Sequence, residues 1–438
     1  MTRPASSSPP ADRSHGVAVA VVTLGCAKNE ADSDVLGHAL TAAGHTLSTP
    51  GDADVIVVNT CGFIDAAKEE SIDALLDLAA VARERGARLV ARGCLVAGYR
   101  AELESELPEV DLFMAFDDGP LLTLLDEVAA DSTAAVRRAP RRRIRPASSY
   151  VKISDGCDHR CAFCAIPLLK GPYRAVDPRD VLATAERALE DGSLEIVLVG
   201  QDTSRWAWPG YGGLSRLLAD LRRLGVPWVR LEYLQPDGID DALLEAMGES
   251  ALPYVDVPLQ HADASVLRRM GRTGDAAAFA DLLDRIRTRL PGAALRSTFL
   301  VGHPGETEAA FDELVAFVRH AALAVGGVFV FDPQTGTPAA AQADRVSRAT
   351  AERRAAVLGA ELESAAAAFW NGQVGTETDL LVEKGSRAAA TEAIGRIPLQ
   401  APDVDGVTFL QGANARRRTI VPVRLTGVTG YDLHATAC

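Results

Sequence analysis

The sequence contains no long hydrophobic run, few cysteines and few aromatic residues. Although 47% of its 438 residues are hydrophobic, they do not gather in a run of about eighteen, so we expect no membrane-spanning helix. Seven cysteines are too few for a disulfide scaffold in a chain of this length. Residues 1–16 are rich in Ser, Pro and Ala and lack the apolar core of a secretory signal, which predicts a disordered leader and a cytoplasmic protein. In a reducing compartment, patterned cysteines more often bind metal or take part in catalysis.

Basic residues are scarce in the segment 17–130, which holds 20 acidic and 7 basic side chains and accounts for most of the net charge of −14. Such a segment disfavours wrapping by nucleic acid and suits either a basic partner or simply a solvated surface. The next segment, 131–148, is instead rich in arginine, with Ala and Pro between. We predict that it is a linker, with contact to RNA phosphates as the alternative. Its arginines are Arg137, Arg138, Arg141, Arg142, Arg143 and Arg145.

Before the linker, short β-branched runs alternate with helical stretches. The runs cover 17–25, 54–60 and 89–94. This alternation predicts an N-terminal parallel α/β domain over 17–130. A cysteine lies at or just past the C-terminal end of each run.

After the linker, strand-like runs resume with helices between them. They comprise the segment ending at Ser154 and the runs 195–200, 228–234, 254–260, 295–302 and 325–331. This repetition predicts a full or partial β/α barrel over 149–372, with its active site at the C-terminal ends of the strands. Short strands with glycine turns follow at 380–383, 407–410 and 420–425. They predict a small antiparallel β-barrel over 373–438.

The strongest motif is a loop in which Cys157, Cys161 and Cys164 follow a strand-like run. Three thiolates from one short loop can hold three corners of a four-iron, four-sulfur cluster and leave the fourth iron without a protein ligand. S-adenosylmethionine needs such an open iron in order to bind and to accept an electron. The alternative is a zinc site, but zinc needs four ligands and His159 is the only further one in the loop. The motif therefore favours a radical S-adenosylmethionine enzyme.

A second set of cysteines is spread over the N-terminal domain. Cys26, Cys61 and Cys94 are separated by 35 and 33 residues, about one β-α unit each. A parallel sheet would bring their loops to one edge, where ligands bind in α/β folds. Gly62 and Gly93 adjoin two of them and would let the backbone approach an inorganic cluster. The set predicts a second cluster, with three buried structural cysteines as the alternative.

Polar side chains follow several of the predicted barrel strands and are candidates for a cofactor pocket. Gln201, Ser204 and Gln260 could bond the hydroxyls of adenosine, and Arg296 could pair with a carboxylate. Loop closure is the alternative role for each of them. Hydrogen abstraction by a radical needs no general base, so two histidines in these loops, at 261 and 303, are left out of the catalytic list. We also assign no role to the terminal Cys438.

Several of these segments resemble the methylthiotransferase family of radical S-adenosylmethionine enzymes. The matching stretches are TLGCAKNEADSDVL at 23–36, NTCGFI at 59–64, GCL at 93–95 and the Cys157 loop. The resemblance extends over nearly the whole chain beyond the leader. It implies an auxiliary four-iron cluster on the three N-terminal cysteines and the radical cluster on the loop. It also implies a C-terminal TRAM module from about residue 373 and two molecules of S-adenosylmethionine per turnover.

Within that family, the chain looks most like the branch that modifies a small-subunit ribosomal protein. The stretches KISDGCDHRCAFCAIP, GQDTS and DVPLQHADASVLRRM carry this likeness, and relatives that modify transfer RNA usually have Asn where Asp202 stands. The resemblance implies 3-methylthioaspartate as product in ribosomal protein uS12, free or in the ribosome, and a reductant such as flavodoxin or ferredoxin. Departures from the family pattern are His303 and the segment 234–236.

Two other functions stay open from the sequence. Methylthiolation of a transfer-RNA adenosine would use the same chemistry, and the arginine-rich linker and the TRAM module would suit it. However, residues 373–438 hold seven acidic and seven basic side chains, which does not resemble a strongly basic RNA clamp. A non-catalytic iron-sulfur protein that binds RNA is the alternative from a different class.

Overall fold

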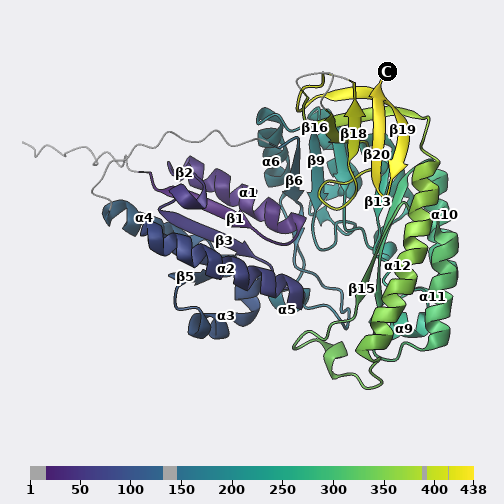
Figure 1. Cartoon of the computed structure of the whole chain (residues 1–438), viewed down its shortest axis with the longest axis horizontal. Helices are drawn as coiled ribbons and strands as arrows, with labels where there is room; N and C mark the ends of the chain where they lie inside the picture. The colour runs from purple at the N-terminus through teal and green to yellow at the C-terminus, as the bar shows by residue number, and fades with distance from the viewer. Residues whose placement is uncertain (1–15, 132–145, 387–391, 413) are drawn as a thin grey trace, which may run out of the picture. The chain divides into compact units, whose positions relative to one another are not determined.

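The computed structural model describes residues 16–131, 146–386, 392–412 and 414–438 (Figure 1). Its internal contacts separate two compact units, Met1–Arg143 and Ile144–Cys438, and the border lies within the predicted linker. The predicted leader, apart from Gly16, and all six arginines of the linker lie outside the described residues. No helix in the described part of the chain is long and apolar enough to cross a membrane.

The first unit contains a parallel sheet of five strands in the order β2-β1-β3-β4-β5. The strands are β1 (Ala18–Thr23), β2 (Thr46–Leu47), β3 (Val55–Thr60), β4 (Arg88–Gly93) and β5 (Leu112–Met114). The helices are α1 (Ala27–Ala42), α2 (Asp65–Arg85), α3 (Cys94–Glu106) and α4 (Gly119–Asp131), with a 3-10 turn η1 (Pro50–Asp52) after β2. The predicted parallel α/β fold of this part is confirmed.

Strand β3 is buried along its whole length because its side chains alternate between two apolar clusters. Ile56 lies in one cluster with Leu75 of α2. Val57 lies in the other with Leu40 of α1. Helices therefore cover both faces of the sheet. Since β3 pairs with both β1 and β4, the carboxyl ends of these three strands lie side by side.

The second unit begins with six parallel strands in two three-stranded sheets, β12-β9-β6 and β13-β14-β15. The strands are β6 (Ser148–Lys152), β9 (Glu195–Val199), β12 (Trp228–Leu231), β13 (Tyr254–Asp256), β14 (Ala294–Val301) and β15 (Val325–Val330). A backbone bond from Leu252 to Val229 (2.7 Å) joins the two sheets. No pairing between β6 and β15 is present among the described strands, so the barrel is partial rather than closed.

Helices between these strands cover the partial barrel. They are α6 (Pro178–Glu190), α7 (Leu214–Arg223), α8 (Asp241–Ser250), α9 (Ala264–Arg269), α10 (Ala276–Arg289), α11 (Glu308–Ala321) and α12 (Arg348–Asn371). The sequence of α7 explains its packing, because Leu214, Leu217, Leu218 and Leu221 lie at helical spacing and are all buried. Figure 1 shows α10, α11 and α12 side by side. Shorter elements near the cysteine loop are β7 (Ser154–Asp155), α5 (Ile166–Lys170) and β8 (Arg174–Ala175). The remaining ones are β10 (Ala207–Trp208), β11 (Gly212–Gly213), η2 (Pro236–Gly238) and η3 (Pro338–Ala341).

The chain ends in a closed five-stranded barrel in the order β16-β17-β18-β20-β19. Its strands are β16 (Glu377–Lys384), β17 (Ala393–Arg396), β18 (Thr408–Gln411), β19 (Ile420–Thr429) and β20 (Asp432–Ala437). The predicted barrel is confirmed, but it is not wholly antiparallel, because β18 and β20 pair in parallel. The terminal Cys438 is exposed, and its backbone N–H is bonded to the carbonyl of Pro422 (3.3 Å).

A buried ionic network connects the small barrel to the partial barrel. Glu195, at the start of β9, is fully buried and accepts bonds from Arg230 Nε (2.7 Å) and from Arg396 Nη2 of β17 (2.5 Å). Burial alone would raise the pKa of Glu195, but the two guanidinium groups outweigh it and lower the pKa to about 2. The Arg230 guanidinium also lies over the ring of Tyr254, 4.7 Å from its centroid. The small barrel is therefore anchored by charges inside the larger domain.

Candidate metal centres

The three cysteines of the first unit lie at the carboxyl ends of three neighbouring strands. Cys26 is the N-cap of α1, three residues after β1. Cys61 follows β3 directly, and Cys94 is the first residue of α3, directly after β4. The sheet order thus places all three at the edge that the sequence predicted.

Glycines let these cysteine loops approach one another closely. A Cβ atom on Gly25 would lie 2.6 Å from the Cβ and 2.9 Å from the Sγ of Cys61. A Cβ on Gly62 would lie 2.8 Å from the backbone nitrogen of Leu95, next to Cys94. Real Cβ atoms do not make such short contacts, so neither position accepts a side chain unless a cysteine loop moves.

Buried polar side chains hold the same loops in place. Asn29 of α1 donates from Nδ2 to the carbonyls of Leu24 (2.8 Å) and Thr60 (3.1 Å), which links the first loop to the second. The hydroxyl of Ser71 in α2 accepts a bond from the backbone N–H of Cys61 (3.0 Å). The sequence interpretation missed both residues, because within an amphipathic pattern they look like ordinary polar positions. Their burial is visible only once the sheet is formed.

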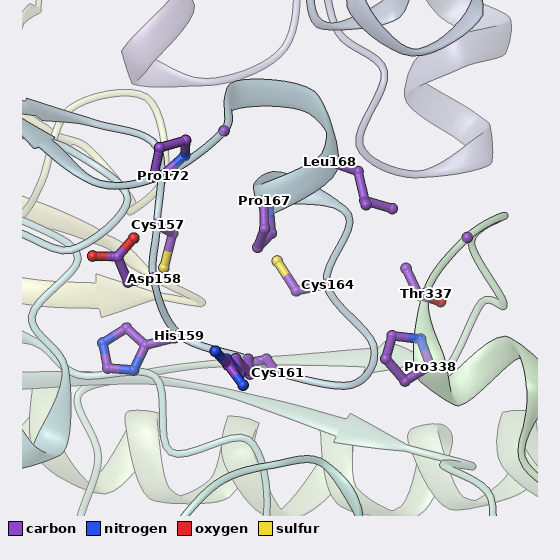
Figure 2. Close-up of a pocket in the computed structure, with 13 residues that line it drawn as sticks. Cys157, Asp158, His159, Cys161, Cys164, Pro167, Leu168, Pro172, Thr337 and Pro338 are labelled. Carbon is purple, nitrogen blue, oxygen red and sulfur yellow. The ribbon is translucent and has the colours of Figure 1, made fainter.

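The cysteine loop of the second unit lies beside a cavity of about 540 Å³ (Figure 2). Cys157, Cys161 and Cys164 all line it, together with residues from α5 and the segment 336–338. The loop turns at Gly156, whose φ of +70° and close approach to the Pro172 carbonyl exclude a side chain. Figure 2 shows the side chains of Cys157, Cys161 and Cys164 among the residues that line the cavity.

Asp158 and His159, the further candidate ligands inside the loop, are bonded elsewhere. Oδ1 of Asp158 accepts a hydrogen bond from the backbone N–H of Tyr173 (2.9 Å). Nε2 of His159 lies 2.8 Å from Oδ2 of Asp202, a carboxylate with no exposed surface. The other oxygen of Asp202 accepts a bond from the hydroxyl of Ser204 (2.7 Å). Within the described part of the chain, no three His, Cys, Asp or Glu side chains are grouped to hold a single metal ion. The loop thus offers three thiols while its two other ligand-type side chains are bonded elsewhere, which fits an open four-iron cluster better than zinc.

Burial raises the pKa of three of the cysteine thiols. It raises the pKa of Cys164 to about 12 and raises the pKa values of Cys157 and Cys61 above the ordinary value. A thiol must lose its proton in order to bind iron. Metal loading is therefore coupled to proton release, and positive charge near these thiols favours it.

The polar residues suggested for a cofactor pocket fall into two groups. Gln201, Ser204 and Gln260 lie just beyond the carboxyl ends of β9 and β13. Gln260 has a positive φ of 72°, a strained conformation that is frequent at functional sites. Arg296 instead lies near the start of β14, where burial would lower its pKa but Asp256 and other nearby groups raise it. It pairs in register with Asp256, the last residue of β13, four residues before Gln260.

The two histidines left out of the catalytic list are fully buried. His261 Nε2 lies 3.8 Å from a carboxylate oxygen of Glu306. Burial lowers the pKa of His303 to about 4, and its ring packs edge-on against Phe331. His303 is therefore neutral at physiological pH and fills a position in the core.

Comparison with known proteins identifies the family. The radical SAM superfamily model matches residues 151–318, the uncharacterized protein family UPF0004 matches 18–115, and the TRAM domain matches 374–438. A "Ribosomal protein uS12 methylthiotransferase RimO" of Anaeromyxobacter sp. (strain Fw109-5) is 40% identical over 94% of this chain and 91% of its own length. The protein of the same name from Solibacter usitatus is 38% identical over 95% and 94%. The chain belongs to the RimO family. It is a radical S-adenosylmethionine methylthiotransferase, and the family implies a four-iron cluster and S-adenosylmethionine as cofactors.

Solved structures resemble this RimO-family chain in fold alone. The radical S-adenosylmethionine methyltransferase TsrM from Kitasatospora setae aligns with a TM-score of 0.56 at 16% identity, over 74% of this chain and 75% of that one. The cobalamin-dependent radical enzyme OxsB aligns with a TM-score of 0.51 at 12% identity, over 80% and 56%. Sequence identity this low supports the shared architecture and carries no information on substrate.

Proposed function

We propose that this chain attaches a methylthio group to the β-carbon of an aspartate in ribosomal protein uS12, giving 3-methylthioaspartate. The observation that carries the proposal is the cavity lined by the thiols of Cys157, Cys161 and Cys164, where Asp158 and His159 are bonded to other groups. An unactivated carbon requires radical chemistry, and an open cluster suits it. The names of the two relatives above supply the choice of uS12.

In this proposal the three thiolates of the loop hold the radical cluster. Bound there, the cluster supplies the electron that cleaves S-adenosylmethionine to the 5'-deoxyadenosyl radical. In this proposal Asp202 holds the ring of His159 through the contact between its Oδ2 and Nε2 of the ring, so the fourth coordination position stays available to the cofactor. Gln201, Ser204, Gln260 and Arg296 remain proposed contacts of the cofactor.

Cys26, Cys61 and Cys94 would hold the auxiliary cluster, which supplies the sulfur. The close approach of Gly25 to Cys61 and of Gly62 to the Cys94 loop supports this role, because side chains there would obstruct an inorganic cluster. Each turnover would consume two molecules of S-adenosylmethionine, one for the methyl group and one for the radical. A one-electron donor such as flavodoxin or ferredoxin would reduce the clusters. The cytoplasmic location stays a prediction.

The proposed substrate can be tested with reconstituted enzyme, S-adenosylmethionine and dithionite without oxygen. We expect mass spectrometry to find one added methylthio group on an aspartate of purified uS12 or of the small ribosomal subunit. A uS12 variant with asparagine at that position is the matched control and should stay unmodified. Modification of an adenosine in transfer RNA, with uS12 left unmodified, would contradict the proposal and favour the transfer-RNA function.

A further inference from the structure

Residues 270–272, directly after α9, all contact the loop that carries Cys157, Cys161 and Cys164. The carbonyl of Met270 accepts a bond from the backbone N–H of Ala162 (2.8 Å), between two of the cysteines. Gly271 has a φ of +71° and packs so closely that a Cβ there would lie 2.5 Å from the carbonyl of Arg160. The third residue, Arg272, reaches the loop with its side chain. The segment 270–272 therefore fixes the cysteine loop and brings one cation to it.

The guanidinium of Arg272 contacts a cluster ligand directly. Its Nη1 lies 3.7 Å from the Sγ of Cys161, within hydrogen-bonding distance for sulfur. The same nitrogen donates to Oε1 of Gln235 (3.0 Å), and Nη2 donates to the carbonyl of Pro258 (2.9 Å). These two further bonds hold the group in one orientation. Gln235 belongs to the segment that departs from the family pattern.

The charge of Arg272 is not neutralised nearby. Its bonding partners are a neutral amide, a neutral carbonyl and the thiol, and no carboxylate forms an ion pair with it in the described part of the chain. Its Nε is buried without a partner there. The net charge around an iron-sulfur cluster and the hydrogen bonds to its sulfurs set its reduction potential. One-electron reduction adds one negative charge and breaks no bond, so a fixed cation beside a ligand stabilises the reduced form.

We propose that Arg272 is a positioning residue that raises the reduction potential of the cluster on Cys157, Cys161 and Cys164 by donating a hydrogen bond to Cys161. This inference rests on the proposed function, since it requires that the loop holds a cluster. Arg272 thereby makes the electron transfer that precedes cofactor cleavage more favourable. It touches a ligand of the cluster rather than the substrate.

The test is a redox titration followed by electron paramagnetic resonance on full-length protein. Cys26, Cys61 and Cys94 are replaced by Ala throughout, so that only the radical cluster contributes a signal. With dithionite as the one-electron donor, Arg272→Gln should lower the ratio of reduced to oxidised cluster about tenfold at a fixed solution potential. For a one-electron couple this is a shift of about 59 mV to lower potential. Arg272→Lys should also lower the reduction potential, but by less, because an ammonium group keeps the positive charge and cannot keep all three contacts.

Arg268→Gln is the matched control, because Arg268 is an exposed arginine at the end of α9, four residues before Arg272. It should leave the potential unchanged. An unchanged potential in a cluster-loaded Arg272→Gln protein would overturn the inference. If Arg272→Gln does not retain iron, the reduction potential of Arg272→Lys is the test. An unchanged potential in Arg272→Lys would also overturn the inference. Absence of any cluster from the parent protein would instead contradict the proposed function.

Discussion

Replacing Cys157 by Ala is expected to abolish the formation of 5'-deoxyadenosine from S-adenosylmethionine. The loop lines its cavity with three thiols, so loss of one leaves two for a four-iron cluster. Chromatography of the reaction mixture under anaerobic reducing conditions measures the product directly. Iron analysis of the same protein should show less bound iron than in the parent protein.

Cys94→Ala should behave differently, because Cys94 lies in the first unit and, in the proposed function, belongs to the sulfur-supplying site. We expect this variant to retain part of the cleavage activity while it forms no methylthio product. Cys438→Ala is the matched control, since this exposed cysteine lies in neither site. If Cys157→Ala and Cys94→Ala lost cleavage to the same extent, the division of labour between the two cysteine sets would be wrong.

Replacing Arg396 by Met should destabilise the second unit by about 3 kcal/mol, because it removes one of the two cations that compensate the fully buried Glu195. Removing one partner of a buried ion pair costs roughly 3–5 kcal/mol, and Arg230 remains to limit the loss. Chemical denaturation at neutral pH measures the change in the free energy of unfolding. Arg424→Met is the matched control in the same barrel, because its pair with Glu377 is more than half exposed. Such a pair contributes at most about 1 kcal/mol.

The pH dependence of this difference has a definite sign. The folded-state pKa of Glu195 is about 2, below its ordinary value of 4.5, so its charged form stabilises the fold above pH 4.5. That contribution is lost as the pH falls from 4.5 towards 2. The free-energy gap between the parent protein and Arg396→Met should therefore narrow over this range. A gap that stays constant, or no gap at neutral pH, would contradict the role assigned to the network.

Much of the fold could be predicted because the strands carry their own local signal. The β-branched run at 54–60 corresponds to β3, and the runs after the linker correspond to the six strands of the partial barrel. The segment of β17 carried no such signal, since its short sequence AIGR lacks an alternating pattern. Arg396 within it is paired with Glu195, 201 residues away. No local pattern reveals a contact at that separation.

In the candidate sites, too, local patterns could be predicted and contacts between distant residues could not. The sequence alone predicted both cysteine sets. The short spacing of Cys157, Cys161 and Cys164 indicates one loop, and the spacing of one β-α unit in the N-terminal set indicates three neighbouring strand ends. The pairing of His159 with Asp202 spans 43 residues, and the contact of Arg272 with Cys161 spans 111. These groups come together only through the order of the barrel strands. The two departures noted from the family pattern, at 235 and 303, became interpretable only when their partners Arg272 and Phe331 were visible.

The most direct test of the central claim follows one hydrogen atom. Purified uS12 with deuterium at the β-carbon of its target aspartate is incubated anaerobically with the reconstituted enzyme, dithionite and S-adenosylmethionine. If the radical generated at the Cys157 loop acts on that carbon, mass spectrometry will find deuterium in 5'-deoxyadenosine and a methylthio group on the aspartate. Deuterium-free 5'-deoxyadenosine formed alongside unmodified uS12 would contradict the account.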